Sequence, residues 1–519
     1  MKNLYLIGIL ILTVFPIQAQ IVNIPDRAFK AVLIEREIDT NNNGEIEYSE
    51  AELITDMYLF SWSGIIFDLT GIEAFINLKS LYFSEHYVTS VDLSSNVNLE
   101  ILECPFNSLE SINVSSCEKL KRISCSQNKL TSLDLSKCVN LEELLCDNNL
   151  LTSLDLSANI SLSKLIAENN RLSNLNLSQN KRLKYLRLDD NKLTTLSLTY
   201  NDSIEYLNCQ NNSLTTINLE NNTLLENLLC DENQLSTFAL PSGHNLTSIS
   251  CSSNQFSEID LSAILGLESF SCNNNSLETI DLASNINLKS ISCAYNNLTS
   301  LDFTNNPNLE SIVCTYNNIS SIDISRNLLL ETLYTHSNPL GILDVSNNVS
   351  LKKLGCDSNG LGSLNLINNT QLEFLQCGNN TFAKLDISQN TNLTYIEIRS
   401  NYKLEEICVW ELPFPPAGVS ISAYGLNLDN IVFTLGDGNT TELKSPITSA
   451  YKVFPNPSSG IFSVLGENVI RIDILDLSGK LITSLSNPIG IDLSAYPKGG
   501  YLIKICASEG IHIKKIIIK

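Results

Sequence analysis

The sequence predicts a repeat solenoid in which each coil contributes one short parallel β-strand. When the 519-residue chain is written in rows of 21 residues from Cys104, eleven of the first fifteen positions in that column are cysteine. Three residues further on, every row from Asn107 to Asn401 has asparagine. Apolar residues recur two and five residues before the cysteine column, and no insertion interrupts the period. A fixed period of this size is typical of coils that bury their apolar side only by stacking on their neighbours.

The cysteine column predicts core packing. Strand side chains alternate, so Leu102 and Cys104 are expected to point inward and Glu103 outward, with cysteine as a small core residue. A metal ladder is disfavoured because no Cys-x-x-Cys or histidine pairing accompanies the column. Stacked strands lie ~4.8 Å apart, which is wider than the Cβ separation of a relaxed disulfide.

Two polar columns are also predicted to be structural. Each asparagine of the column from Asn107 to Asn401 is expected to turn inward and bond the unpaired backbone groups of its own turn and of the next coil. The aspartate of the phrase LTSLDLS is interpreted as part of a solvated or turn-fixing side of the coil. It recurs at Asp134, Asp155, Asp260, Asp281, Asp302, Asp323, Asp344 and Asp386.

Two cysteines lie outside the main column. Cys117 and Cys138 are one repeat apart, in a column that is otherwise mostly asparagine. Since they lie at a turn of neighbouring coils, they could form a disulfide in an oxidising compartment.

The repeated motif L-x-x-L-x-C-x-x-N-x-L resembles the leucine-rich-repeat family. It covers roughly residues 64–409 and keeps its register from row to row. The resemblance implies a solenoid of leucine-rich repeats with parallel β-strands over these residues.

The first residues predict a secretory signal peptide. Residues 1–19 contain one early lysine, an apolar stretch over residues 4–15 and a small residue, Ala19, after which cleavage is expected. The apolar stretch is short and no second one follows, so no transmembrane segment is predicted. No cysteine stands at the junction, which disfavours a lipoprotein anchor.

Residues 20–63 predict a small helical cap with an EF-hand-like loop. Pro25 and Asp26 are typical of a helix start, and residues 49–57 are expected to form an exiting helix. The segment DTNNNGEIEYSE between them matches the calcium loop pattern D-x-N-x-N-G-x-I-x-x-x-E. The predicted calcium ligands are Asp39, Asn41, Asn43, the carbonyl of Glu45, Glu47 directly or through water, and Glu50 as a bidentate ligand. One weak site is expected, with a dissociation constant of roughly 10⁻⁴ to 10⁻³ M; the alternative is an acidic loop that binds nothing.

The last part of the chain predicts a cap and linker over residues 410–450 and a small β-sandwich over residues 451–519, because short alternating strands are separated by turns. Several of its phrases resemble the type A sorting domain of the type IX secretion system of Bacteroidetes. They are Pro455-Asn456-Pro457, Asp476-Leu477-Ser478-Gly479, residues 493–500, Tyr501 and the basic end at Lys514, Lys515 and Lys519. The resemblance implies recognition by that machinery, export across the outer membrane, removal of the domain, and release or attachment to the cell surface.

Charge and composition narrow the function. A formal net charge of −23 disfavours binding to nucleic acid and to anionic membranes. The four histidines are scattered, no catalytic motif is present, and no pair of acidic residues is marked by an apolar setting. We therefore predict a protein that is not an enzyme.

The outward strand positions of the central rows predict a binding surface. Apolar and aromatic residues lie there beside acidic ones, a combination typical of interaction patches. The predicted partner-binding residues are Leu145, Asp147, Ile166, Glu168, Tyr185, Asp189, Tyr206, Leu229 and Asp231. A second, weaker set is Tyr334, His336, Phe374 and Tyr395. The expected function is a secreted or cell-surface protein that binds an extracellular protein or glycan, unless these rings merely cover the strands. The alternative is a calcium-stabilised spacer or a self-associating surface layer.

Overall fold

The computed structural model describes residues 20–60, 64–240, 243, 245–436, 452–454, 461–465, 469–476, 480–486, 491–507 and 510–519. The chain divides into two units, Met1–Leu330 and Glu331–Lys519, which are described separately. The predicted signal peptide, most of the predicted linker, Pro455-Asn456-Pro457 and Leu477-Ser478-Gly479 lie outside the described residues.

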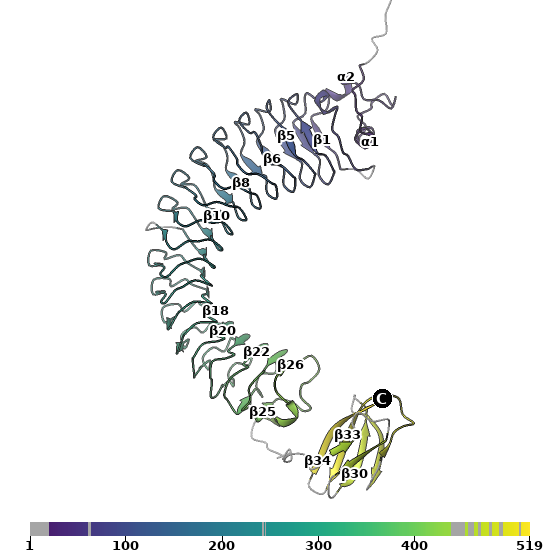
Figure 1. Cartoon of the computed structure of the whole chain (residues 1–519), viewed down its shortest axis with the longest axis vertical. Coiled ribbons are helices and arrows are strands. Elements are labelled where there is room, and N and C mark those ends of the chain that lie inside the picture. Colours follow the sequence, from purple (N-terminus) through teal and green to yellow (C-terminus); the bar gives the residue numbers. More distant parts are fainter. Residues whose placement is uncertain are drawn as a thin grey trace, which may run out of the picture. The chain divides into compact units, whose positions relative to one another are not determined.

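The first unit begins with the predicted helical cap (Figure 1). Helix α1 spans Arg27–Glu35, and Asp26 caps it by accepting hydrogen bonds from the amides of Ala28 and Phe29. The second carboxylate oxygen of Asp26 accepts from the amides of Phe67 and Asp68, which ties the cap to the chain that enters the repeats. Helix α2 spans only Tyr48–Ala51 and is shorter than predicted, because the chain from Asp56 onward pairs in the first parallel strand.

The coils of the first unit place one strand each in a parallel sheet, whose outward surface we call the strand face (Figure 1). The register is that of the sequence period, so Leu144 lies opposite Leu165, 21 residues on. The strands are β1 (Asp56–Tyr58), β2 (Ser80–Tyr82), β4 (Ile101–Glu103), β6 (Arg122–Ser124), β7 (Glu143–Leu145), β8 (Lys164–Ile166), β9 (Tyr185–Arg187), β10 (Tyr206–Asn208), β12 (Asn227–Leu229), β14 (Ser248–Ser250), β15 (Ser269–Ser271), β16 (Ser290–Ser292) and β18 (Ser311–Val313).

Further parallel pairs lie on another side of the coils, which we call the second side. They are β3 (Ser90–Asp92) with β5 (Ser111–Asn113), β11 (Ile217–Asn218) with β13 (Phe238–Ala239), and β17 (Leu301–Asp302) with β19 (Ile322–Asp323). A 3₁₀ turn, η1, spans Ile72–Ala74 in the first coil. The aspartate column lies on this second side, and its members fix turns as predicted: the Asp134 carboxylate accepts a hydrogen bond of 3.0 Å from the amide of Ser136.

The cysteine column is part of the core, as predicted. Leu102 and Cys104 are fully buried, whereas Glu103 between them is half-buried on the strand face. Burial raises the pKa of the Cys125 thiol and of the Cys209 thiol to about 12, so both remain protonated at neutral pH.

The asparagine column forms the predicted ladder, with one correction. The Asn128 amide nitrogen donates to the carbonyls of Cys125 and Ser126 in its own turn, at 3.0 and 3.1 Å. Its remaining partners, the Cys104 carbonyl at 3.0 Å and the Leu109 amide at 2.9 Å, belong to the preceding coil and not to the next one. The reason is that the end of each strand has a carbonyl and an amide to which the asparagine of the following coil bonds.

A second asparagine ladder accounts for the two unusual cysteines. Asn159 is buried and donates to the carbonyls of Leu135 and Cys138 in the preceding coil, at 3.1 and 2.8 Å. Cys117 takes the same place two column members before Asn159, and its thiol donates to the Leu93 carbonyl at 3.3 Å. Cys117 and Cys138 are free thiols in the structure, so the disulfide that their spacing allowed is not formed.

The second unit contains further coils and the carboxy-terminal sheets. Its strand face consists of β20 (Thr332–Tyr334), β21 (Lys353–Gly355), β22 (Phe374–Gln376), β24 (Tyr395–Glu397) and β26 (Ser420–Ser422). A second parallel sheet consists of β23 (Lys384–Asp386), β25 (Glu406–Val409) and β27 (Val432–Leu435), and η2 spans Leu428–Asn430. Parallel pairing therefore continues past residue 409 into the segment predicted as a cap.

The carboxy-terminal strands are antiparallel, in agreement with the predicted small β-sandwich. One sheet contains β28 (Lys452–Phe454), β29 (Ile461–Leu465) and β32 (Ile491–Asp492). The other contains β30 (Val469–Leu475), β31 (Leu481–Ser486), β33 (Gly499–Ala507) and β34 (Gly510–Ile518). Side chains of both sheets, among them Val464, Ile491, Ile472 and Ile503, share one core.

Candidate functional site

The predicted calcium loop has a tightly wound backbone. Its first residue, Asp39, is buried and accepts hydrogen bonds from the amides of Asn43 and Gly44 at 3.1 and 2.8 Å. The turn needs positive φ at two positions, 57° at Asn42 and 82° at Gly44, and glycine reaches such values without strain. Ile46 is fully buried and anchors the loop to the cap.

Two glutamates close the end of this loop. Glu50 accepts from the Thr40 amide and hydroxyl, both at 2.7 Å, and from the Glu47 amide at 3.0 Å. Burial raises the pKa of Glu50, but the hydrogen bonds from Glu47 and Thr40 outweigh it and lower the pKa to about 2. Glu47 accepts from the side-chain amides of Asn41 at 3.0 Å and Asn43 at 2.6 Å.

These residues fit a mixed set of oxygen ligands. Within the described part of the chain, no three His, Cys, Asp or Glu side chains gather into a group that could hold a metal ion. A cation at the loop would therefore need the asparagine and carbonyl oxygens of the predicted set as well as carboxylates. Asn41 and Asn43 now turn their NH₂ groups to Glu47, and rotation of each amide would present oxygen instead.

The nine predicted partner-binding residues all lie on the strand face of the first unit. Tyr185 and Tyr206 stack with ring centroids 4.5 Å apart and planes 8° from parallel. The Lys164 ammonium lies 5.4 Å from the centroid of the Tyr185 ring. Leu145 and Ile166 are half-buried neighbours in the other outward column of β7 and β8. The pattern therefore brings these residues together as predicted.

The acidic members of this surface are engaged by neighbours. Arg187 forms ion pairs with Glu168 and with Asp189, the latter at 3.3 Å. Asp231 accepts from the Ser250 hydroxyl at 2.7 Å and from the Ser252 amide at 2.5 Å. Asp147 accepts from the Asn148 side-chain amide at 2.9 Å and from the Ser126 hydroxyl. The negative charge of the acidic residues in this set is therefore partly neutralised by Arg187, a residue that the sequence prediction left out.

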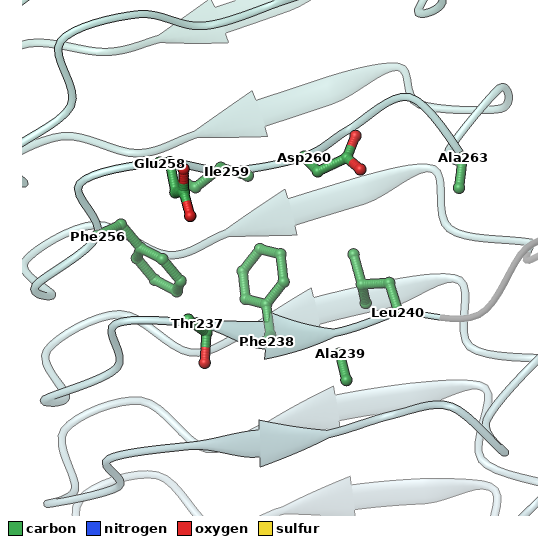
Figure 2. A pocket seen from close by; sticks show the side chains of 9 residues that line it. All are labelled: Thr237, Phe238, Ala239, Leu240, Phe256, Glu258, Ile259, Asp260 and Ala263. Carbon is green, nitrogen blue, oxygen red and sulfur yellow. The ribbon is translucent and has the colours of Figure 1, made fainter.

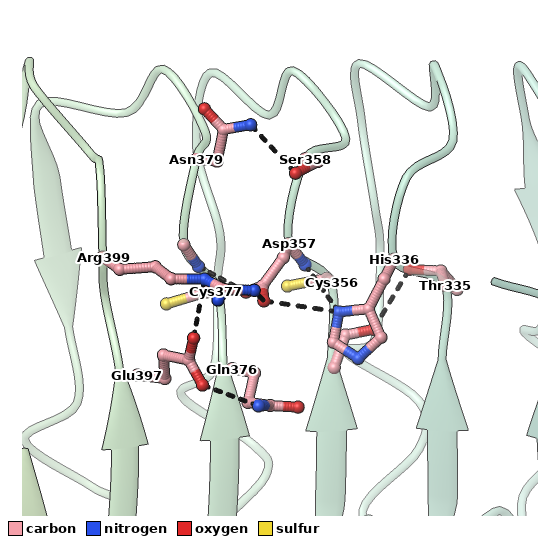
Figure 3. A network of polar contacts seen from close by, with 12 residues as sticks. Thr335, His336, Cys356, Asp357, Ser358, Gln376, Cys377, Asn379, Glu397 and Arg399 are labelled. Atoms are coloured by element: carbon pink, nitrogen blue, oxygen red, sulfur yellow. Dashed lines mark hydrogen bonds and ion pairs between the residues drawn. The ribbon is translucent and has the colours of Figure 1, made fainter. Parts of the chain in front are cut away.

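The second unit contains a buried polar network that the sequence prediction missed (Figure 3). The Asp357 side chain is only 5% exposed, and its carboxylate lies 3.4 Å from the Arg399 guanidinium. It also accepts a hydrogen bond of 2.5 Å from the Gly378 amide. Glu397 pairs with Arg399 at 2.7 Å and accepts from the Gln376 amide at 2.7 Å. Asp357 and Glu397 are thus a pair of buried acidic residues, whereas the sequence had indicated that no pair of acidic residues was marked by its setting.

Two glycines make room for this network. A Cβ atom on Gly355 would lie 2.3 Å from the Tyr334 ring and from the His336 ring. A Cβ atom on Gly378 would lie 2.7 Å from Arg399 Cγ, where that side chain crosses toward Asp357. Glycine at the end of β21 and again just after β22 is the sequence signal that could have located the network.

The predicted second set of residues borders this network. Phe374 and Tyr395 stack at 4.8 Å, and Tyr334 meets the edge of Phe374 at 6.4 Å. Burial raises the pKa of Asp357 to about 6 and lowers the pKa of His336. His336 Nδ1 accepts the Asp357 amide proton at 3.2 Å, so the neutral imidazole carries its proton on Nε2.

The fold and the carboxy-terminal residues together define a leucine-rich-repeat solenoid with a secretion signal. Residues 452–519 match a family model described as a secretion system C-terminal sorting domain, which agrees with the resemblance drawn from the sequence. The protein is therefore secreted or attached to the outer surface. No helix in the described residues is both long and apolar enough to span a membrane.

Solved leucine-rich-repeat structures resemble the chain. The functional domain of InlJ from Listeria monocytogenes, which includes a cysteine ladder, is 21% identical with a TM-score of 0.57, over 97% of this chain and 99% of that one. A leucine-rich-repeat protein of Leptospira interrogans is 22% identical with a TM-score of 0.56, over 72% and 97% of the two chains. YopM from Yersinia enterocolitica is 22% identical with a TM-score of 0.58, over 74% and 89%. No curated protein matches the chain. These likenesses establish the fold.

Proposed function

We propose that this secreted leucine-rich-repeat protein binds an extracellular protein or glycan through the strand face of its first unit, in adhesion or recognition and without catalysis. The observation that carries the proposal is the stacked pair Tyr185 and Tyr206 beside Leu145 and Ile166. These side chains are only half-buried, so they present apolar surface to solvent. Aromatic residues are the commonest anchors of binding surfaces.

The surface is organised before any partner arrives. Each ring is held by its stacked neighbour on adjacent strands, and Arg187 is held between two carboxylates. Side chains that are already ordered lose less conformational entropy on binding, which favours affinity. A rigid sheet of parallel strands also fixes the spacing of the rings.

The test measures binding of the full secreted chain to a panel of extracellular proteins and glycans. Any interaction found is repeated with Tyr185→Ala/Tyr206→Ala and with the control Ser269→Ala/Ser290→Ala, which changes half-buried serines on the same face. We expect a loss of at least about tenfold for the tyrosine variant, since hot-spot truncation costs about 2 kcal/mol or more, and none for the control. Unchanged binding by the tyrosine variant would exclude this surface. If no member of the panel binds and light scattering shows concentration-dependent oligomers, the result would support the self-associating layer instead.

We also propose that the amino-terminal loop binds one calcium ion and locks the cap. The support is the closed loop around Asp39, Glu47 and Glu50, and the link from Asp26 to the entry of the repeats. When bound, the ion would supply a positive charge that offsets the repulsion among these buried carboxylates. Side-chain oxygens of Asp39, Asn41, Asn43, Glu47 and Glu50 and the Glu45 carbonyl would hold it.

The calcium proposal is tested by thermal unfolding of the full chain in calcium and in chelator. We expect the cap transition to rise in temperature, half-maximally at roughly 10⁻⁴ to 10⁻³ M calcium, and the rise to be absent in Glu50→Gln. The variant Glu52→Gln, at an exposed position just beyond α2, is the matched control and should respond like the wild type. Equal transitions in calcium and chelator for the wild type would refute the proposal.

A further inference from the structure

A cleft of about 500 Å³ opens on the second side of the coils, between the coil that contains β13 and the next coil (Figure 2). It lies away from the strand face, and Asp260 of the aspartate column is one of its lining residues. Its lining residues are Thr237, Phe238, Ala239, Leu240, Phe256, Glu258, Ile259, Asp260 and Ala263.

The cleft arises from three departures from the repeat pattern. Phe238 and Phe256 stand in columns where earlier coils have leucine, as at Leu133 and Leu130. Ala239 stands in the column that elsewhere has aspartate or asparagine, or serine at Ser197. The two phenyl rings tilt against each other at 59° with centroids 4.9 Å apart. Phe256 is buried, whereas Phe238 is only half-buried, so the Phe238 ring forms an accessible floor.

Corresponding grooves between other coils are different in character. The groove lined by Ser132, Asp134, Ser153, Asp155 and Ser157 has its leucine, Leu133, almost completely buried. A third groove is lined largely by asparagine, serine and threonine, from Asn174 to Asn218. The regular repeat therefore lines its grooves mainly with polar residues, and this cleft differs from them by its two phenyl rings and its alanine.

The rim of the cleft is negatively charged. Glu258 and Asp260 are both exposed, and none of the nine lining residues is basic. Asp260 accepts a hydrogen bond of 2.9 Å from the Ser262 amide. Hydrogen bonds from the side chain and the backbone of Ser262 lower the pKa of Asp260, so it stays ionised in mildly acidic surroundings. An apolar floor with two carboxylates at its edge is complementary to an apolar group that lies next to a cation.

We propose that this cleft is a docking site for a short peptide segment of a partner protein, in which an aromatic or aliphatic side chain is adjacent to lysine or arginine. The apolar side chain fills the space between Phe238, Leu240 and Ile259, and the cation lies at Glu258 and Asp260. The volume is within the range of pockets that hold small ligands. The proposal is independent of the strand face, because no residue is shared between the two surfaces.

The test selects peptides from a random display library on the full chain and titrates each selected peptide by fluorescence anisotropy. The first variant, Phe238→Leu/Ala239→Asp, restores the residues that other coils have at these positions, so the fold is expected to persist. The second variant, Glu258→Gln/Asp260→Asn, removes the charge, and asparagine keeps the turn because other coils use it there. The control, Asp134→Asn/Asp155→Asn, makes the same charge change in the polar groove.

We expect the selected peptides to pair an apolar residue with lysine or arginine. Their affinity should fall at least about tenfold in both cleft variants and stay within about twofold in the control, with a salt dependence that the Glu258→Gln/Asp260→Asn variant reduces. Three results would overturn the proposal: no peptide whose binding depends on the cleft, enrichment of peptides that pair an apolar residue with glutamate or aspartate, or equal loss in the control. Circular dichroism of each variant separates loss of binding from loss of fold.

Discussion

At the scale of single residues, Asp357 is the clearest case of a side chain whose burial has a measurable consequence. Burial raises its pKa from 3.8 to about 6, although the Gly378 amide and Arg399 favour the ionised form. The folded state therefore binds the Asp357 proton more tightly than the unfolded state does. Stability from this group is present below about pH 4 and is lost as the pH rises toward 6.

We predict that Asp357→Asn removes this pH dependence. The asparagine oxygen can still accept from the Gly378 amide, but it cannot ionise. The free energy of unfolding of the wild type relative to the variant should fall by up to about 3 kcal/mol between pH 4 and pH 7. Denaturant unfolding of both proteins across that range measures the difference.

The groups that face Asp357 are the same in both proteins, so their own titration largely cancels. They are His336, Glu397, Arg399 and the buried thiols of Cys356 and Cys377. The control Asp344→Asn changes an exposed carboxylate of the turn-fixing column. Parallel pH profiles for the wild type and Asp357→Asn would contradict the burial argument.

The residue scale also shows where the sequence was sufficient and where it failed. The period alone placed Tyr185 and Tyr206 on adjacent strands of one face, because the register equals the repeat length. It did not reveal that Arg187 is shared by two carboxylates, which depends on side-chain conformation. The network around Asp357 was missed for a related reason: Arg399 reaches across two coils only because Gly378 has no side chain.

At the scale of the elements, the cysteine column behaves as a structural unit. The thiols are buried in the apolar interior, where ionisation is unfavourable. Burial also raises the pKa of the two cysteines outside the column, to about 12 for Cys138 and to about 11 for Cys117. A thiol that stays protonated is a poor nucleophile for disulfide exchange or alkylation.

We predict that the fourteen cysteines whose burial the structure describes react slowly with thiol reagents in the native protein, and that all fifteen cysteines of the chain react once it is unfolded without reductant. The slow step in the native state is opening of the coils. Ellman titration with and without guanidinium measures both quantities. If the unfolded, unreduced protein has two reactive thiols fewer than its fifteen cysteines, Cys117 and Cys138 are joined by a disulfide.

Elements were predicted well where the repeat imposes them. Fixed spacing set the strand positions, the alternation of Leu102 and Cys104, and the buried asparagine ladder. The second ladder, in which Asn159 bonds the preceding coil, was missed because the sequence indicates only that its members lie in turns. The exit helix was predicted too long, since local propensity does not include the pairing of β1 with β2.

At the scale of the whole molecule, the chain combines parts that act at different stages. A solenoid gains stability by stacking each coil on its neighbours, so its first coil requires a cap, which α1 and the Asp26 link supply. The carboxy-terminal sheets have a core of their own. A segment with its own core can be recognised by the export machinery without help from the repeats.

This separation predicts the effect of removing the sorting domain. In a bacterium that makes the protein, a chain lacking residues 452–519 should fold its repeats but fail to reach the medium or the cell surface, because the secretion machinery recognises those residues. Fractionation with an antibody against the repeats, with surface protease as a second readout, measures the distribution. The reciprocal control joins residues 437–519 to a periplasmic reporter, which should then be exported. Export of the truncated chain at wild-type level would mean that the repeats themselves carry an export signal, and retention of the reporter would mean that residues 437–519 are not sufficient alone.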